Sequence, residues 1–400
     1  MNSVTQLLIG KGVVIPCPEI TWIESDINPD RIEAGSWIGP GSKISGQESL
    51  IRRGARIGTE GPAFVTDCAV GHDVVLASGS FTESVFLDGS SIGPSAQVRF
   101  GTLLDERASA AHCVGLKQTI LLPYATLGSL INFCDALLAG GTGSDDHSEV
   151  GSGFIHFNFT PHGDKATPSL FGNVCDGAWL RESRVFLGGS GGVVGPVSIG
   201  FGTVLAAGSV YRKDRGPGIL VYSEPLPAVA RAFDPKEVRG VRARVRRNVD
   251  YMSQLAALYA FFRDARAVLV SEDALGALLN KSTLKLLVQS GQERFKQLTK
   301  LADIAVSHRE GEEGRYCASL SARLSAALSA LTDFEAAANA ADAQARQHVL
   351  SSLRVGQTWC DAAKRLPTSS VAAGKKWLGG VVESYVNNPA VAALLGDPSS

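Results

Sequence analysis

The feature that most constrains this chain is a six-residue repeat of aliphatic side chains in its first half. Isoleucine returns at Ile32, Ile38 and Ile44. A helical face repeats every 3.6 residues and a half-buried strand every second residue, so neither explains a period of six. The same interval continues at Ile51 and Ile57, at Val70 and Leu76, at Phe86, Ile92, Val98 and Leu104, and at Leu187, Val193, Ile199 and Leu205.

Each six-residue unit is predicted to form one short strand and one bend of a triangular coil. The aliphatic residue points to the axis, and a small residue such as Gly41, Gly54, Ser95 or Gly202 fits the tight corner. Stacked coils pair their backbone groups and bury a continuous apolar column. A glycine-rich β-sandwich, the alternative, does not hold a six-residue phase over four repeats. The pattern therefore predicts a left-handed parallel β-helix.

The chain divides by composition, because 34 of its 44 glycines precede residue 228. We predict the β-helix over residues 1–225 and an all-α domain over residues 228–400. The six-residue phase breaks at residues 59–69, 77–85 and 156–178, where we expect loops to leave the coil. The main inserted loops are expected within residues 140–178, and loops are where binding and catalytic groups concentrate.

The second half carries helical periodicity instead. Leu255, Leu258 and Phe262 lie on one helical face, and FEAAANAADAQARQHVL is strongly helix-forming. We expect five to seven helices, with Ser271 as an N-cap. An arginine cluster at residues 239–247 indicates a basic helix, and we interpret it as a solvated or oligomer-contact face rather than a nucleic-acid surface.

Composition narrows the function classes. The 38 basic and 39 acidic residues leave a formal net charge of −1, so no global field recruits nucleic acid or a membrane. Seven scattered cysteines show no CxxC spacing and predict neither a disulfide framework nor a zinc site. We find no signal peptide and no long apolar run, and expect a cytoplasmic protein.

The polar stretch from residue 145 to residue 167 carries the candidate chemistry. Acyl transfer to an amine needs a base, donors for the developing oxyanion and a substrate clamp. His147 stands among Asp145, Asp146 and Glu149, which we expect to orient its imidazole and raise its pKa. On a strand, His156 and Asn158 share a face, because alternate side chains point the same way. Candidate substrate-binding residues from the same stretch are His162 and Lys165.

Other interpretations of these residues stay open. A polar loop on a β-helix often carries histidine and aspartate only as solvated or turn-forming side chains. The spacing of His147, His156 and His162 matches no standard zinc motif, so we predict no metal. His72 and Asp73 resemble the HDxxxG pattern of lipid A acyltransferases, and the glycine run at residues 188–195 is interpreted as tight coil corners.

The segments FNFTPHGDKATPSLFGNV and VFLGGSGGVVGPVSIGFGTVLAAGSVYRKD resemble a known family. They are similar to the acetyltransferase half of the bacterial bifunctional enzyme that makes UDP-N-acetylglucosamine, a hexapeptide-repeat transferase. Asn158 matches the asparagine of the family's loop and Thr167 its later threonine. Ala206 and Ala207 match the final coil, which implies contact with acetyl-CoA.

The chain also departs from that family. It has no counterpart of the pyrophosphorylase half, and the family's catalytic histidine would fall near Asp135, which leaves His147 as a shifted alternative. Ser223 stands near the place of the family's CoA-binding arginine.

Three functions follow from the resemblance. The first is acyl transfer from acetyl-CoA to an amino sugar or sugar nucleotide, in a homotrimer with clefts between adjacent β-helices. The second is a non-catalytic sugar-nucleotide-binding protein or trimeric scaffold whose helical domain docks a protein partner. The third is sugar-phosphate nucleotidyl transfer.

Overall fold

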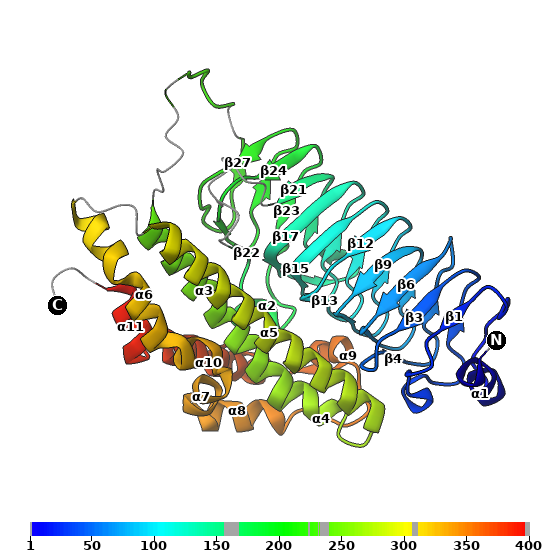
Figure 1. Ribbon diagram of the computed structural model, residues 1–400. Helices are drawn as coiled ribbons and strands as arrows, with labels where there is room; N and C mark the ends of the chain where they lie inside the picture. Colours follow the sequence, from blue (N-terminus) through cyan, green and yellow to red (C-terminus); the bar gives the residue numbers. More distant parts are fainter. Residues whose placement is uncertain are drawn as a thin grey trace.

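The computed structural model describes residues 2–155, 168–222, 225–230, 232, 240–305 and 311–396. The first part is a left-handed parallel β-helix, as the six-residue repeat predicts (Figure 1). A short helix, α1 (Ser3–Lys11), precedes it and buries Leu8 in the core of the β-helix. Every aliphatic residue of the predicted repeat is buried in the axis, and successive coils pair in parallel.

Three faces make up the β-helix, and each coil gives one short strand to each face. The first face consists of β1 (Trp22–Ile23), β3 (Lys43–Ser45), β6 (Ala63–Thr66), β9 (Gly79–Thr82), β12 (Ala96–Val98), the first parts of β15 (Gly115–Leu121) and β17 (Ile131–Leu138), β21 (Gly153–Ile155), β24 (Gly191–Val193) and β27 (Val210–Tyr211). The second face consists of β4 (Leu50–Ile51), β7 (Ala69–Val70), β10 (Ser84–Phe86), β13 (Thr102–Leu104), the later parts of β15 and β17, β22 (Ser169–Phe171) and β25 (Ser198–Ile199). The third face consists of β2 (Trp37–Ile38), β5 (Arg56–Ile57), β8 (Val75–Leu76), β11 (Ser91–Ile92), β14 (Ser109–Ala110), β16 (Thr126–Leu127), β20 (Glu149–Val150), β23 (Phe186–Leu187), β26 (Val204–Leu205) and β28 (Leu220–Val221).

The four corners that the sequence predicts have a left-handed backbone conformation, which favours small residues. Gly41, Gly54, Ser95 and Gly202 have φ values of 73°, 77°, 62° and 74°, in the left-handed region. Tyr124 adopts the same conformation with φ 65°, so a corner does not require a small side chain.

Two of the expected loops are wrong. Residues 59–69 and 77–85 contain β6 and β9, which pair in register with β3 and β12, because the longer turns absorb the extra residues without breaking the stack. Of the third break, residues 156–167 lie outside the described residues, and the rest forms β22 and a short helix, α2 (Val174–Gly177).

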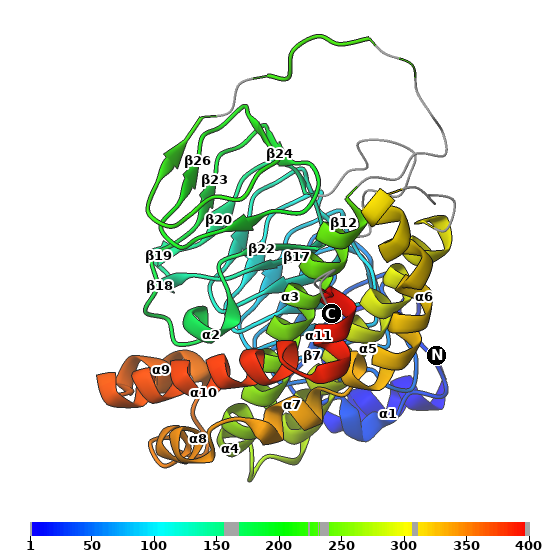
Figure 2. The same cartoon turned by 90° about the vertical axis from the view of Figure 1, so that its left-hand side faces the viewer.

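Helices cover the second face of the β-helix. Figures 1 and 2 show α3 (Val241–Ala260) and α5 (Ala274–Ala305) lying along one side of the coils. α5 contacts β7, β10 and β13, while α3 contacts α2 and β22. The side chains that point outward from this face are apolar and buried in a core shared with the helices: Leu50, Ala69, Val85, Leu103, Ile120 and Leu137.

The helical region has more helices than the five to seven expected, because its alanine-rich part is broken into short segments. Asp342 caps a new helix within FEAAANAADAQARQHVL by accepting a hydrogen bond from the Ala345 N–H at 2.9 Å. Ser271 is not the N-cap of α5: the Asp273 carboxylate accepts from the Gly276 N–H at 3.0 Å instead.

None of the described helices is long and apolar enough to cross a membrane. The remaining helical segments are a π-helix (Phe261–Arg266), α4 (Ala267–Leu269), α6 (Gly311–Thr332), α7 (Phe334–Ala340), α8 (Ala343–Leu350), α9 (Trp359–Arg365), α10 (Thr368–Val386) and α11 (Pro389–Leu395).

Buried ion pairs join the helices to the β-helix. Arg266 of the π-helix donates to Asp105 at 2.5 Å and to Glu106 at 2.8 Å, and Glu106 also accepts from the Trp359 N–H at 2.8 Å. Arg294 of α5 donates to Asp135 at 2.5 Å. Removing one partner of a buried pair leaves an uncompensated charge, so these contacts hold the two regions in one relative position.

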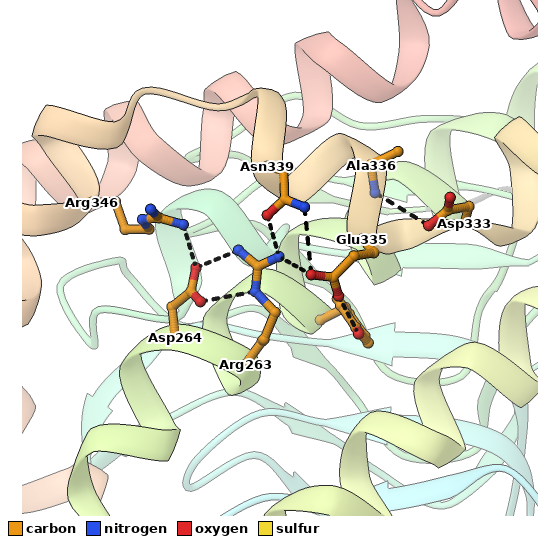
Figure 3. Close-up of polar contacts among 8 residues, drawn as sticks. Arg263, Asp264, Asp333, Glu335, Ala336, Asn339 and Arg346 are labelled. Atoms are coloured by element: carbon orange, nitrogen blue, oxygen red, sulfur yellow. Dashed lines mark hydrogen bonds and ion pairs between the residues drawn. The ribbon is translucent and has the colours of Figure 1, made fainter.

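A polar cluster on the other side of the π-helix fixes the helices to one another. Arg263 donates to Asp264 at 2.8 Å and to Glu335 of α7 at 2.8 Å, and Arg346 of α8 lies 3.3 Å from Asp264 (Figure 3). Asn339 accepts a further hydrogen bond from Arg263 at 2.8 Å. Because each charge faces an opposite charge, we assign this cluster a structural role.

The buried carboxyl of Asp105 predicts a pH-dependent stability. Burial raises its pKa to about 6, against the attraction of Arg266, and its Oδ2 atom is buried without a hydrogen-bond partner. A raised folded-state pKa means that the stability from this group is full below about pH 4 and is lost as pH rises through 6. We expect Asp105→Asn to remove this loss, on the order of 2 kcal/mol.

The measurement is the urea unfolding free energy of wild type and Asp105→Asn at pH 4.5 and pH 7. The difference between the two proteins should shift in favour of the variant at pH 7. Asp303→Asn, on the exposed surface of α5, is the matched control and should show no such shift. A pH-independent difference for Asp105→Asn would contradict the expectation.

Candidate ligand-binding site

The predicted site residues fall in two places and partly outside the described residues. His147 lies in β19 (Asp146–His147), which pairs with β18 (Gly141–Gly143) in a hairpin beside α2. Its Nδ1 atom is 2.8 Å from the carbonyl oxygen of Ser144. The remaining predicted residues of the loop, His156, Asn158, His162, Lys165 and Thr167, lie outside the described residues.

The neighbouring carboxylates have other partners than the His147 imidazole. Asp146 accepts from the Thr142 hydroxyl at 3.2 Å and lies 3.5 Å from the Arg184 guanidinium. Asp145 accepts a long hydrogen bond from Ser144 at 3.5 Å. The His147 ring is thus hydrogen-bonded to a backbone carbonyl, and this bond fixes the ring within its own hairpin.

Ala206 and Ala207 lie in the last complete coil. Ala206 is half-buried and Ala207 is exposed, and the Ala206 N–H donates to the Val221 carbonyl at 3.0 Å. A side chain on Gly188 of the preceding coil would come within 2.5 Å of the Ala207 backbone nitrogen. Glycine is therefore required at residue 188 by the close approach of two coils. The contact of Ala206 and Ala207 with acetyl-CoA stays a prediction.

A cleft opens where the end of the second face meets the helices. Its volume is about 320 Å³, and it lies between β22 and β25 on one side and α3 and α10 on the other. Its wall includes Pro168, Leu170, Gly172 and Asn173, which form the last part of the segment FNFTPHGDKATPSLFGNV. The polar and aromatic residues that line it are Asn173, Ser198, Phe201, Arg247, Asp250, Ser253 and Gln254.

The charges of the cleft come from both regions of the chain. Arg247 of α3 forms an ion pair with Asp214, which follows β27, and Asp214 also accepts from the Ser198 N–H at 2.8 Å. Burial raises the pKa of the Asp250 carboxyl, and the nearby Arg247 and Arg246 guanidinium groups oppose this rise. An aspartate with a raised pKa is a better proton acceptor than a solvated one.

Amides and one aromatic ring complete the cleft. Gln254 is buried, and its side-chain oxygen accepts from the Val174 N–H at 2.8 Å. Asn173 caps α2 by accepting from the Asp176 N–H at 2.8 Å. Phe201 lies against Gly172, where a Cβ atom would come within 2.4 Å of its ring. The arrangement suits a small polar ligand with hydroxyl groups and a ring that packs on Phe201.

Sequence reasoning missed Arg247 and Asp250 as members of one cleft, and Asp214 as the ion-pair partner of Arg247. The arginine cluster was interpreted as a solvated or oligomer-contact face, yet Arg247 turns toward the β-helix, and Arg242 lies over the Tyr316 ring at 4.9 Å. The signal that could have found them is Asp250 one helical turn after Arg246 and Arg247. Among the described residues, no group of three histidine, cysteine or carboxylate side chains could hold a metal.

The fold and its repeats resemble those of the hexapeptide-repeat β-helix transferases. No family model matches the chain. The chain is similar to curated proteins named bifunctional protein GlmU. The protein from Thermotoga maritima is 29% identical over 217 residues, which is 54% of this chain and 43% of that protein. The one from Bifidobacterium longum subsp. infantis is 30% identical over 213 residues, which is 53% of this chain and 41% of that protein. The chain thus matches less than half the length of these relatives.

The contact of Phe201 with Gly172 gives a stability prediction. Alanine at residue 172 would combine a left-handed backbone, with φ 73°, and a clash with the ring. Gly208 offers a matched control, because its φ is 71° and no atom lies within 4 Å of its hypothetical Cβ. We expect Gly208→Ala to cost about 1 kcal/mol from backbone strain alone and Gly172→Ala about 2–3 kcal/mol. Urea unfolding measures both, and equal losses would show that Phe201 does not pack as described.

Proposed function

We propose that this protein transfers an acetyl or other acyl group from coenzyme A to the amine of an amino sugar or sugar nucleotide bound in the cleft. The observation that carries the proposal is the lining of the cleft: Pro168, Gly172 and Asn173 belong to the segment that resembles the acetyltransferase family. The similarity to bifunctional protein GlmU supports a sugar-nucleotide substrate. The cleft volume of about 320 Å³ lies within the range of small-molecule binding sites.

The chemistry needs one proton acceptor and one leaving group. The amine nitrogen attacks the thioester carbonyl carbon, a C–N bond forms and the C–S bond breaks. The amine loses a proton, and the departing thiolate of coenzyme A ends as a thiol. In our proposal Asp250, which lines the cleft and whose pKa is raised by burial, accepts the proton, while Asn173 and Phe201 position the sugar. The predicted residues His147, His156 and Asn158 stay candidates for the same step.

A second candidate is non-catalytic binding of a sugar nucleotide. The observation that favours it is the environment of Asp135, near which the family's catalytic histidine would fall. Asp135 is buried and paired to Arg294 of α5 at 2.5 Å, so that position serves the joint between β-helix and helices instead of a reaction.

The two candidates predict different results in one assay. Purified protein is incubated with acetyl-CoA and glucosamine 1-phosphate, and released thiol is measured. We expect turnover in wild type and a loss of about 100-fold or more in kcat/KM for Asp250→Asn. His147→Ala and Asn158→Ala test the predicted loop and hairpin, with Asp303→Asn as the control that should keep wild-type turnover.

A thermal-shift measurement on the same proteins separates a binding protein from an enzyme. A ligand that binds only the folded state raises the melting temperature. No thiol release, together with a shift by UDP-N-acetylglucosamine, would reject acyl transfer and establish the non-catalytic candidate.

A further inference from the structure

A groove at the opposite end of the β-helix collects positive charge between α5 and the first coils. Its basic part has a volume of about 350 Å³ and is lined by Arg31, Glu48, Lys281 and Lys285, with Leu50 and Leu278 as apolar walls. Ligand-binding clefts begin at roughly 300 Å³. The groove belongs to the early coils, so it is distinct from the cleft between β22, β25, α3 and α10.

The cations of this groove outnumber its carboxylates. Glu48 lies 3.5 Å from the Arg31 guanidinium and 3.9 Å from the Lys285 ammonium, distances too long for hydrogen bonds. Lys281 forms no ion pair within the part of the chain that the structure describes. Two cations therefore lie near Glu48, and the lining of this part of the groove has three cations and one exposed carboxylate.

Other arginines between the β-helix and the helices form shorter contacts with their carboxylates. Arg52, one coil further on, donates to Glu33 at 2.7 Å and to Asp273 at 2.8 Å, and its side chain is buried. Arg266 and Arg294 likewise contact their carboxylates at 2.5 Å. Those arginines hold the helices on the β-helix. In the groove, Lys281 and Lys285 are exposed, while Arg31 is partly buried and donates to the Gln47 carbonyl at 3.0 Å. None of the three has a carboxylate oxygen within 3.4 Å among the described residues, so they contribute little to the joint and can bind an anion from solution.

The chemistry of the groove selects a phosphate group. A guanidinium binds phosphate oxygens in a fork, and two lysines add point charges that adapt to its position. The Ser282 hydroxyl lines the same groove and can donate a hydrogen bond. The adjoining part of the groove, of about 120 Å³, shares Glu48 and Lys285 with the basic part and adds Asp67 and Glu83. These two carboxylates would repel an anion, so the phosphate is confined to the Arg31 end.

We propose that this groove is a binding site for a small phosphate-bearing ligand, held by Arg31, Lys281 and Lys285. In the free protein the Glu48 carboxylate lies near Arg31 and Lys285, where it would compete with the phosphate. Two kinds of substitution should therefore change the affinity for phosphate in opposite directions. Removing the lysines weakens binding, while removing the charge of Glu48 strengthens it. A merely structural role of these side chains would not produce opposite signs.

Isothermal titration of the full chain with inorganic phosphate and with pyrophosphate tests the proposal. We expect saturable binding at low salt that weakens as salt is added. The double variant Lys281→Ala/Lys285→Ala should raise Kd about tenfold or more, and Glu48→Gln should lower it about threefold or more. The matched control is Lys296→Ala/Lys300→Ala, because these lysines are exposed on the same helix beyond the groove. Its Kd should equal that of wild type.

Either of two results would overturn the proposal. One is no saturable binding of phosphate or pyrophosphate to wild type. The other is an equal loss of binding in the groove and control variants, which would show a diffuse effect of helix charge. The same titrations on Asp250→Asn keep this site separate from the proposed reaction, because that variant should bind phosphate in the groove like wild type.

Discussion

The structure depends on the parallel stacking of coils at a fixed spacing. Each strand takes its backbone hydrogen bonds from the coils above and below, so neighbouring strands lie about 4.8 Å apart along the axis. Where coils approach most closely, only glycine fits: a Cβ on Gly151 would lie 2.7 Å from the Gly189 nitrogen. The result is a frame whose three flat faces are set by backbone pairing and whose inward column is set by apolar side chains.

One of those faces is completed by the chain's own helices. The outward residues of the second face are apolar, for example Val85 and Leu103, whereas the third face carries Ser109 and Thr126 at the equivalent positions. A helix turn advances 5.4 Å, close to the coil spacing, so α5 can lie along the axis and contact successive coils, at β7, β10 and β13. The homotrimer that the resemblance implies would have to use the first and third faces.

Both proposed sites lie where this helical cover meets the β-helix. At one end, Arg247 of α3 pairs with Asp214 of the last coil, and burial raises the pKa of Asp250 beside them. At the other end, Lys281 and Lys285 of α5 face the first coils. Between these ends, Arg266 and Arg294 are buried with their carboxylates, and the cavity beside Arg266 has a volume of about 70 Å³. The joint is therefore tighter in its middle than at its ends.

The sequence by itself determined the β-helix, because a six-residue apolar period and left-handed corners such as Gly41 and Gly54 are local requirements of the coil. It also contained the covered face, in adjacent apolar pairs such as Val85–Phe86 and Leu103–Leu104, where one residue points inward and the next outward. Only the tertiary structure decided which helices return to that face. The ion pair between Asp105 and Arg266, like the one between Asp214 and Arg247, joins residues far apart in the chain, and no periodicity encodes such a pairing. The proposed sites belong to the tertiary structure for the same reason, since each is made from two elements that meet only after folding.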